Sequence, residues 1–275
     1  MQLNEIINII EQIAPLNGAA SWDNSGMQVA GRRNFIQKLV LCLDPSPSAL
    51  RRAVELEAQL VITHHPLLLT PRLPSALDPF HEALSLLFRA DVALYAAHTS
   101  LDAAMDGPAS WLARELALQD IRVLAPCPNK THPLQGFGCV GESPEPLSLD
   151  ELFARLARHI SMEGASLSGP PVDGAGRLTR IAFCPGSGAS LVQTAADAGA
   201  DIFLTGYVKY PSALDAPLPL LDLGHHSLEE EMTRRFALAL GERLSGAQAH
   251  FLPSANPIRP AISTGVCKPV LENPR

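Results

Sequence analysis

A short apolar run from Leu60 to Thr63 constrains the fold of this chain more than any other feature of its sequence. The run is rich in β-branched residues, does not alternate with polar residues, and is closed by Pro66. This pattern is typical of a strand that is buried on both faces of a parallel sheet. Because parallel strands need crossover connections, the sequence predicts an α/β fold.

The segments around this run alternate between predicted strands and predicted helices. Residues 38–43 form another apolar run, and residues 44–47 (Asp-Pro-Ser-Pro) supply a cap and a first-turn proline for the helix that follows. A further helix at about residues 79–89 leads to a strand at residues 92–96. Such strand–helix–strand units are almost always right-handed, so these strands end on the same edge of one sheet.

Side chains that bind metal ions follow three of the predicted strands. They are His64, His65, His98, Asp102, His225 and Glu229. Open α/β sheets bind ligands at the carboxyl ends of their strands, and neutral imidazole is the commonest metal ligand among side chains. A single histidine near a strand end is more often a hydrogen-bonded structural residue. A metal site is predicted because metal-binding side chains recur at the ends of three strands.

The helix predicted after residue 224 carries three consecutive acidic residues in its first turns. Ser227 and Glu230 match a capping box, so we expect a structural role for Glu230. Glu229 is then free, four residues after His225, where an imidazole and a carboxylate can reach one cation. An acidic first turn favoured by the helix dipole explains the acids but not His225.

The number of candidate ligands exceeds what one ion requires, because tetrahedral zinc uses three or four protein ligands. Two carboxylates that can bridge, with histidines on either side, fit a two-metal centre whose ions lie about 3.5–4 Å apart. The implied chemistry is hydrolytic. We therefore expect two divalent metal ions per chain, and histidine with carboxylate suits zinc, manganese, iron or nickel.

A second module is predicted after residues 126–133, which are rich in proline and polar residues. Within it, a strand at residues 178–184 is followed by Pro-Gly-Ser-Gly at residues 185–188 and by a helix at residues 189–198. A glycine-rich turn that enters a helix can offer backbone N–H groups to an anion. A plain strand-to-helix turn needs no ligand, and for so short a motif it is the favoured interpretation.

Composition narrows the classes of function. A chain of 275 residues can bury a sizeable core, and we expect two domains. The net charge of -7 argues against nucleic-acid binding, which needs clustered Lys and Arg. Neither a secretory signal nor an apolar run of membrane-spanning length is expected. The cysteines, scattered and without a C-x-x-C pair, fit reduced thiols in a cytoplasmic protein. They are Cys42, Cys127, Cys139, Cys184 and Cys267.

Six sequence blocks, taken in order, resemble those of a known family. They are residues 22–27 (Trp-Asp-Asn-Ser-Gly-Met), 62–66 (Ile-Thr-His-His-Pro), 98–102 (His-Thr-Ser-Leu-Asp), 185–188 (Pro-Gly-Ser-Gly), 205–206 (Thr-Gly) and 224–229 (Gly-His-His-x-x-Glu). The chain resembles the dinuclear metal centre proteins known as GTP cyclohydrolase 1 type 2 homologues. The resemblance spans almost the whole chain, and its histidine-containing blocks are specific in combination although each alone is weak.

This resemblance implies a set of roles and an architecture. The metal ligands it implies are His64, His65, Asp102, His225 and Glu229. Asp102 and Glu229 would be the bridging pair, and His98 would line the pocket, supporting a ligand or transferring a proton. The resemblance also implies a mostly parallel α/β core domain from residues 1–129 and 223–275, a smaller inserted α/β domain at residues 130–222, and a toroidal homohexamer whose metal sites face an internal cavity.

The sequence departs from the family pattern at three places. Tyr207 stands where an acidic residue usually follows Thr-Gly, and Leu228 replaces the usual Ser or Thr before Glu229. Residues 109–111 (Ala-Ser-Trp) replace a Gly-rich Asn-Asp stretch. The implied ligands are intact, so these changes bear on the polarity of the pocket and hence on the substrate.

Two functions follow from these observations. The first is a metal-dependent hydrolase of a nucleotide-like or small polar substrate, with GTP ring opening implied by the family name alone. The alternative is a non-catalytic metal-binding protein that acts in assembly or interaction. Nucleic-acid binding through a ring cavity is weakened by the acidic balance of the chain.

Overall fold

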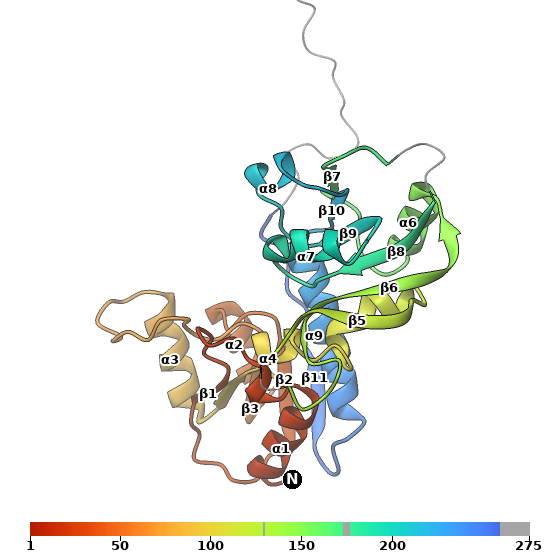
Figure 1. Ribbon diagram of the computed structural model, residues 1–275. Helices are drawn as coiled ribbons and strands as arrows, with labels where there is room; N and C mark the ends of the chain where they lie inside the picture. Colours follow the sequence, from red (N-terminus) through yellow and green to blue (C-terminus); the bar gives the residue numbers. More distant parts are fainter. Residues whose placement is uncertain (129, 173–176, 259–275) are drawn as a thin grey trace, which may run out of the picture.

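The structure is a computed structural model that describes residues 1–128, 130–172 and 177–258. These residues form two sheets that lie one above the other in Figure 1, and a long helix, α9 (His225–Gly241), runs from the second sheet down alongside the first. Cys267 and the end of the C-terminal core segment, both covered by the expectations above, lie outside the described residues.

The first sheet has the strand order β1-β4-β3-β2-β11. Its strands are β1 (Gly26–Val29), β2 (Lys38–Cys42), β3 (Leu60–Thr63), β4 (Ala93–Ala96) and β11 (Gln248–Phe251). The four strands β4, β3, β2 and β11 are parallel, and β1 pairs antiparallel with β4 at one edge. The prediction of a mostly parallel sheet built from both ends of the chain is confirmed.

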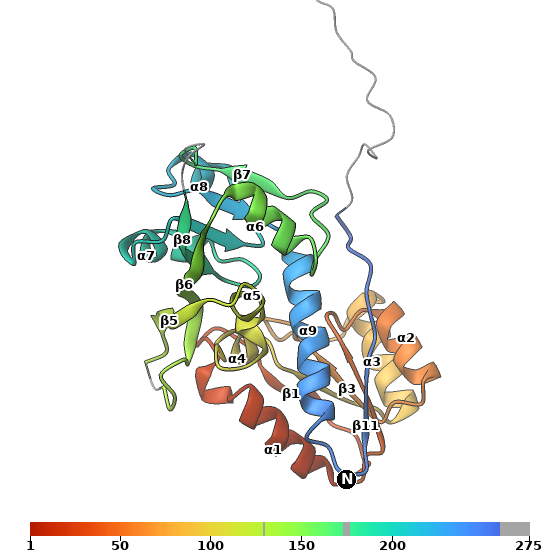
Figure 2. The same cartoon turned by 90° about the vertical axis from the view of Figure 1, so that its right-hand side faces the viewer.

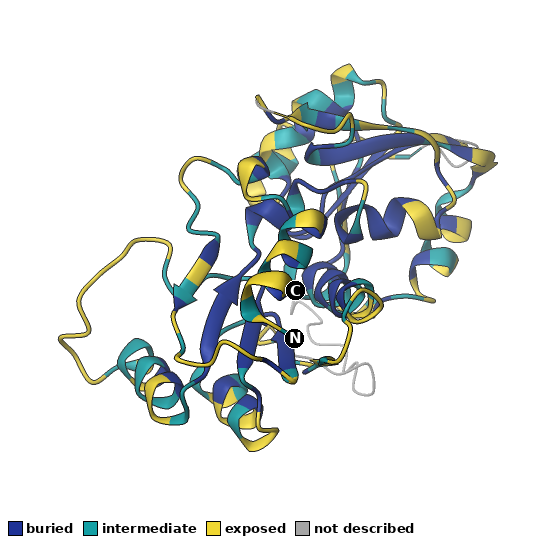
Figure 3. Ribbon diagram, turned by 90° about the horizontal axis from the view of Figure 1, so that it is seen from below, coloured by how far each residue is buried: buried dark blue, intermediate teal, exposed yellow. Residues whose placement is uncertain are grey.

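Buried side chains of β2 and β3 alternate between the two faces of this sheet. On one face, Val40 and Val61 share a hydrophobic cluster with α2 (Pro47–Glu55) and α3 (Pro79–Ala90). On the other, Leu39 and Ile62 share a cluster with α1 (Leu3–Ile13) and α9. Figure 3 shows the buried strands between these half-exposed helices. Each buried side chain of this size contributes roughly 1.5–3 kcal/mol, which holds the strand ends in place.

The second sheet has the order β5-β6-β8-β9-β10-β7. Its strands are β5 (Gln119–Pro126), β6 (Gly136–Leu147), β7 (Ser166–Ser168), β8 (Leu178–Phe183), β9 (Ile202–Thr205) and β10 (Leu220–Asp222). Strands β8, β9 and β10 are parallel, and the other pairs are antiparallel. Because β5 belongs to it, this sheet begins earlier in the chain than residue 130, the start expected for the inserted domain.

Short helices accompany the second sheet. They are α6 (Leu149–Leu156), α7 (Val192–Asp197) and α8 (Tyr210–Leu214). The helix predicted at residues 189–198 is divided, because a 3₁₀ turn at Ala189–Leu191 precedes α7. The segment from Gly107 to Leu118 is likewise divided. It consists of a 3₁₀ turn at Pro108–Ser110 and α5 (Trp111–Glu115), and Ala117 then adopts a left-handed conformation with φ of 55°.

One hydrophobic cluster joins the two sheets. It contains Leu39 of β2, Phe183 of β8 and Phe236 of α9. Trp111 of α5 is 1% exposed and packs edge-to-face on Phe183, with ring centroids 6.1 Å apart. Figure 2 shows α9 running alongside the first sheet with its first turn near the second. The start of α9 therefore lies at the junction of the two sheets. None of the helices in the described ranges is both long and apolar enough to cross a membrane.

Candidate metal centre

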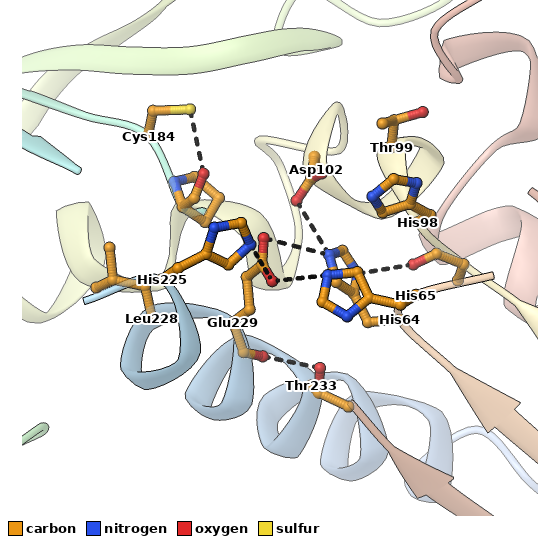
Figure 4. Close-up of polar contacts among 12 residues, drawn as sticks. His64, His65, His98, Thr99, Asp102, Cys184, His225, Leu228, Glu229 and Thr233 are labelled. Atoms are coloured by element: carbon orange, nitrogen blue, oxygen red, sulfur yellow. Dashed lines mark hydrogen bonds and ion pairs between the residues drawn. The ribbon is translucent and has the colours of Figure 1, made fainter. Parts of the chain in front are cut away.

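The first ligand segment leaves the end of β3 at the edge where the parallel strands terminate. The backbone N–H groups of His64 and His65 donate to the carbonyls of Cys42 and Leu43 at 3.2 and 3.0 Å, which continues the pairing with β2. The Thr63 hydroxyl donates to the His65 carbonyl at 2.7 Å and tightens the turn. Both imidazoles are thereby directed toward the first turn of α9 (Figure 4).

His64 is buried, and its hydrogen bonding fixes its tautomer. Its Nδ1 lies 3.0 Å from the carbonyl oxygen of Ala97, which can only accept, so Nδ1 carries the proton. In the neutral ring the Nε2 lone pair is then free. That atom lies 3.5 Å from Glu229 Oε1 and 3.8 Å from Asp102 Oδ1.

His65 is oriented in the same way by a carboxylate. Its Nδ1 donates to Asp44 Oδ1 at 2.8 Å, and its Nε2 lies 3.2 Å from Glu229 Oε2. Burial opposes a charge on His65, but the hydrogen bonds and charges of Asp44 and Glu229 outweigh it and raise its pKa to about 10. A carboxylate behind a histidine is a common arrangement at metal sites, because it fixes the ring and increases its basicity.

Glu229 is the carboxylate at the centre of the cluster. It is 3% exposed, and its Oε2 lies 2.8 Å from His225 Nε2, one helical turn earlier on α9. Burial opposes its ionisation, yet the charge of His64 and contacts with His225 and His65 hold the pKa of Glu229 well below its usual value. The carboxylate is therefore charged while buried, a state that proteins maintain only with compensating cations or donors.

Asp102 ends the short helix α4 (Thr99–Asp102), which follows β4. Burial raises the pKa of Asp102 to about 7; the charge of His64 opposes this rise, and that of Glu229 adds to it. Its Oδ1 faces His64. Two carboxylates thus point at the same buried imidazole.

The predicted ligands meet at one place and leave polar atoms without partners. Within the described residues, His64 Nε2, Asp102 Oδ1 and Glu229 Oε2 are buried and accept no well-aligned hydrogen bond. Leaving such groups unsatisfied costs about 1–3 kcal/mol each, and more when charged. A cation placed among them would satisfy all three. The residues present therefore fit a divalent metal ion.

Among the residues that the structure describes, three sets of side chains could each hold an ion, with all ligand atoms of a set within 4.8 Å of one another. They are His64, Asp102 and Glu229; His65, His225 and Glu229; and His64, His65 and His98. Glu229 belongs to the first two sets, whereas Asp102 belongs only to the first. Imidazole and carboxylate together form a donor set suited to zinc or other transition metals.

His98 lies beside the ligand histidines and is held by Asp23. Its Nδ1 donates to Asp23 Oδ1 at 2.7 Å, and its ring centroid is 5.2 Å from that of His64. Asp23 also accepts from Ser25 Oγ at 2.6 Å and from the Thr99 N–H at 3.1 Å. Burial opposes the charge of Asp23, but these hydrogen bonds keep its pKa well below normal. With Nδ1 bound to Asp23, Nε2 is the ring nitrogen of His98 that remains for a ligand or a proton.

Sequence reasoning missed the two carboxylates behind the histidines. Asp23 accepts a hydrogen bond from the backbone N–H of Asn24 at 2.7 Å, and it also orients His98. Asp44 orients His65, while Ser46 caps α2. The only signal for Asp23 was its place in the first of the six sequence blocks, and no signal singled out Asp44.

The predicted capping box at Ser227 and Glu230 is wrong. Gly224, with φ of 83°, is the N-cap of α9, so both residues lie within the helix. Glu230 accepts instead from the backbone N–H and hydroxyl of Ser254, at 2.6 and 3.0 Å. His226 Nε2 also contacts the Ser254 hydroxyl, at 2.9 Å. Of the second histidine pair, His225 faces the metal centre and His226 holds the C-terminal segment.

The glycine-rich turn after β8 has a steric role. Gly186 has φ of 62°, and a Cβ built there would collide with Glu229 Oε1. The Gly188 N–H donates to Thr205 Oγ1 at 2.9 Å, and that hydroxyl donates to the Gly186 carbonyl at 3.1 Å. These bonds tie the turn to the end of β9. The second sheet therefore closes over Glu229 without a side chain between them.

The residues at which the sequence departs from the family pattern do not lie among the proposed metal ligands. Leu228 is buried in the core that joins the sheets, and Trp111 packs in the same core. Tyr207 is 46% exposed and is not part of the pocket wall. The polarity of the pocket is set by other residues.

A cavity of about 620 Å³ opens over the centre at the junction of the sheets. Its polar wall includes His65, His98, Asp102, His225 and Glu229. Its remaining wall comes from both sheets and includes Trp22, Leu69, Phe137, Pro185 and Leu191. Volumes of this size accommodate small organic ligands.

The fold and the site together define a two-sheet α/β protein with a buried histidine and carboxylate centre that can hold a metal ion. The model of the Duf34/NIF3 (NGG1p interacting factor 3) family matches residues 1–257. The chain belongs to this family, which confirms the resemblance seen in the sequence blocks.

Individual relatives support the same assignment. The chain is 33% identical over 235 residues to a GTP cyclohydrolase 1 type 2 homolog of Streptomyces coelicolor, covering 83% of this chain and 81% of the relative. It is 31% identical over 250 residues to a protein of the same name from Clostridium perfringens, covering 89% and 93%. Among solved structures, reduced HcgD from Methanocaldococcus jannaschii superposes with a TM-score of 0.78 at 28% identity, covering 92% of this chain and 98% of that chain.

Proposed function

We propose that this protein is a metal-dependent hydrolase that holds two divalent metal ions and acts on a nucleotide-like or small polar substrate. The observation that carries the proposal is the convergence of three buried atoms that accept no well-aligned hydrogen bond, His64 Nε2, Asp102 Oδ1 and Glu229 Oε2. The names of the relatives, which call them homologues of a cyclohydrolase, support the reaction class.

The ligand sets divide naturally between two ions. His64 and Asp102 would hold one, His65 and His225 would hold the other, and Glu229 would serve both. When bound, a pair of divalent cations supplies Lewis acidity and stabilises the negative charge that develops during hydrolysis. The metal is zinc, manganese, iron or nickel in this proposal.

The residues around the ligands would orient the site and move protons. Asp44 holds His65 with its Nε2 toward Glu229, and Ala97 does the same for His64. His98, held at Nδ1 by Asp23, would accept and return a proton at Nε2, which faces the cavity. A histidine with this orientation is suited to general acid–base catalysis.

The metal proposal is tested by elemental analysis of protein purified without chelators. We expect two metal ions per chain in the native protein and fewer than one in Glu229→Gln. The matched control is Glu230→Gln, the next residue of α9, which binds Ser254 instead of the centre and should keep two ions. A native ratio near zero contradicts the proposal.

The hydrolase proposal is tested by turnover. Metal-loaded protein should hydrolyse at least one member of a panel of nucleotides and cyclic amides, and the rate should disappear after chelation and in Glu229→Gln. Two bound metals without turnover of any substrate would overturn the hydrolase assignment and leave a non-catalytic metal-binding protein.

We also propose that the chain forms a toroidal homohexamer in the cytoplasm. The sequence blocks shared with the family support the assembly, and the four cysteines within the described ranges, all buried free thiols, support a reducing compartment. Light scattering should give six times the chain mass. A monomeric mass at micromolar concentration would contradict the assembly.

A further inference from the structure

The cavity over the metal centre has a second wall that the hydrolase proposal does not explain. It is apolar and contains Trp22, Leu69, Phe137 and Leu191. Trp22 is 63% exposed and Leu69 is 52% exposed. Large apolar side chains left open beside a polar centre indicate a surface that a ligand covers.

Trp22 is held in a fixed position relative to the centre. Its ring lies edge-to-face with His98, with centroids 5.9 Å apart and an interplanar angle of 72°. The next residue, Asp23, is bound to His98, Ser25 and Thr99, so the backbone that carries Trp22 is anchored. An indole placed this way provides a rigid stacking surface at low entropic cost.

The charges around the cavity do not suit a phosphate chain. Among the described residues, no lysine or arginine lines it. Asp102 and Glu229 lie in its wall, and Asp23 and Asp44 lie directly behind the histidines. Four carboxylates balance the four positive charges of two divalent cations, so the loaded centre has little excess charge. Protein sites that bind phosphate groups usually contain Arg or Lys side chains that neutralise the phosphate charge.

Given the two-metal hydrolase proposed above, on which this inference rests, we infer that the substrate is an uncharged planar heterocycle, such as a nucleobase or nucleoside. Its ring stacks on Trp22 while its polar edge faces the metal ligands. A triphosphate chain adds nothing to its binding. The cavity of about 620 Å³ has room for a ligand of this size.

The chain contains a built-in reporter for this contact. It has two tryptophans, of which Trp111 is 1% exposed and Trp22 is 63% exposed. A ligand that stacks on Trp22 should therefore quench the fluorescence of this exposed tryptophan and leave the emission of Trp111 unchanged. The probes are guanosine and GTP, titrated into protein whose metal content has been measured. We expect guanosine to quench, and GTP to bind no more tightly than guanosine at any salt concentration.

Variants separate stacking from metal binding. Trp22→Leu should weaken guanosine binding roughly tenfold in calorimetry, the scale of base stacking on an aromatic side chain, while retaining the native metal ratio. The matched control is Phe88→Ala, which removes an aromatic side chain that is 65% exposed on α3 and outside the cavity wall. That variant should bind guanosine as the native protein does.

Three results would overturn the inference while leaving the metal centre intact. They are GTP binding at least tenfold tighter than guanosine, unchanged guanosine affinity in Trp22→Leu, and failure of metal-loaded protein to bind guanosine, adenosine or cytidine. Native protein without bound metal would instead contradict the proposed hydrolase itself. The metal ratio therefore distinguishes the two failures.

Discussion

Replacing Gly186 by alanine tests whether the second sheet must approach Glu229 this closely. The residue has φ of 62°, and an added Cβ would collide with Glu229 Oε1. The left-handed conformation alone costs an alanine about 1–2 kcal/mol. The collision adds a second effect, because Glu229 must move away from His64, His65 and His225, the imidazoles with which it shares a buried cluster.

A matched glycine isolates the collision from the backbone strain. Gly246 has φ of 80°, and nothing lies within 4 Å of a Cβ placed there. Both Gly186→Ala and Gly246→Ala should lower the unfolding temperature of chelated protein by roughly 2–8 °C, at about 2–4 °C per kcal/mol for a chain of this size. Only Gly186→Ala should lose metal affinity, by about 10–100-fold, the usual cost of disturbing a residue that holds a ligand.

The assay combines scanning calorimetry of chelated protein with competition against a metal-binding dye. The reasoning is refuted if Gly186→Ala retains the metal affinity of the native protein. It is equally refuted if Gly246→Ala loses as much affinity, since strain without contact would then account for the effect.

Three further predictions concern the centre and the core. His225→Ala should remove one metal ion per chain in elemental analysis, whereas His226→Ala, which loses a contact to Ser254 instead, should remove none. Because the pKa of His65 is raised from 6.5 to about 10, its contribution to the stability of chelated protein is complete below pH 6.5 and is lost between pH 6.5 and 10. The unfolding temperature of chelated protein should therefore fall as the pH rises from 6.5 to 10. Calorimetry in buffers of different ionisation enthalpy should show that metal binding releases a proton. An unfolding temperature that does not change with pH would contradict this. Trp111→Ala should cost about 3–5 kcal/mol in denaturant unfolding, and a loss below 1 kcal/mol would show that the core joining the sheets is loosely packed.

Local sequence patterns predicted the strands that carry the ligands. The run ending at Thr63 contains four buried residues in a row, and its short length, its β-branched residues and the proline that closes it favour a strand over a buried helix. The histidines after it could then be placed at a sheet edge. Strands with half-exposed side chains, such as β11 with its exposed Gln248, lack this pattern and were not predicted.

The supporting carboxylates could not be predicted, because their partners are distant in the chain. Asp23 and His98 are 75 residues apart, and Asp44 and His65 are 21 apart. Nothing in the local sequence of an aspartate in a turn distinguishes these bonds from a bond to its own backbone. The Glu230 prediction was wrong for the same reason, because a partner far along the chain, Ser254, took the place of a cap.

The hydrophobic cluster that contains Phe183 and Phe236 joins the two sheets, so we expect them to unfold as one cooperative unit. Rotation of one half against the other would expose this shared hydrophobic cluster to water, which opposes closure of the cavity by such a movement. Ligands then enter a cavity that is already formed. Selectivity then depends on the shape of this cavity and on the charges in its wall.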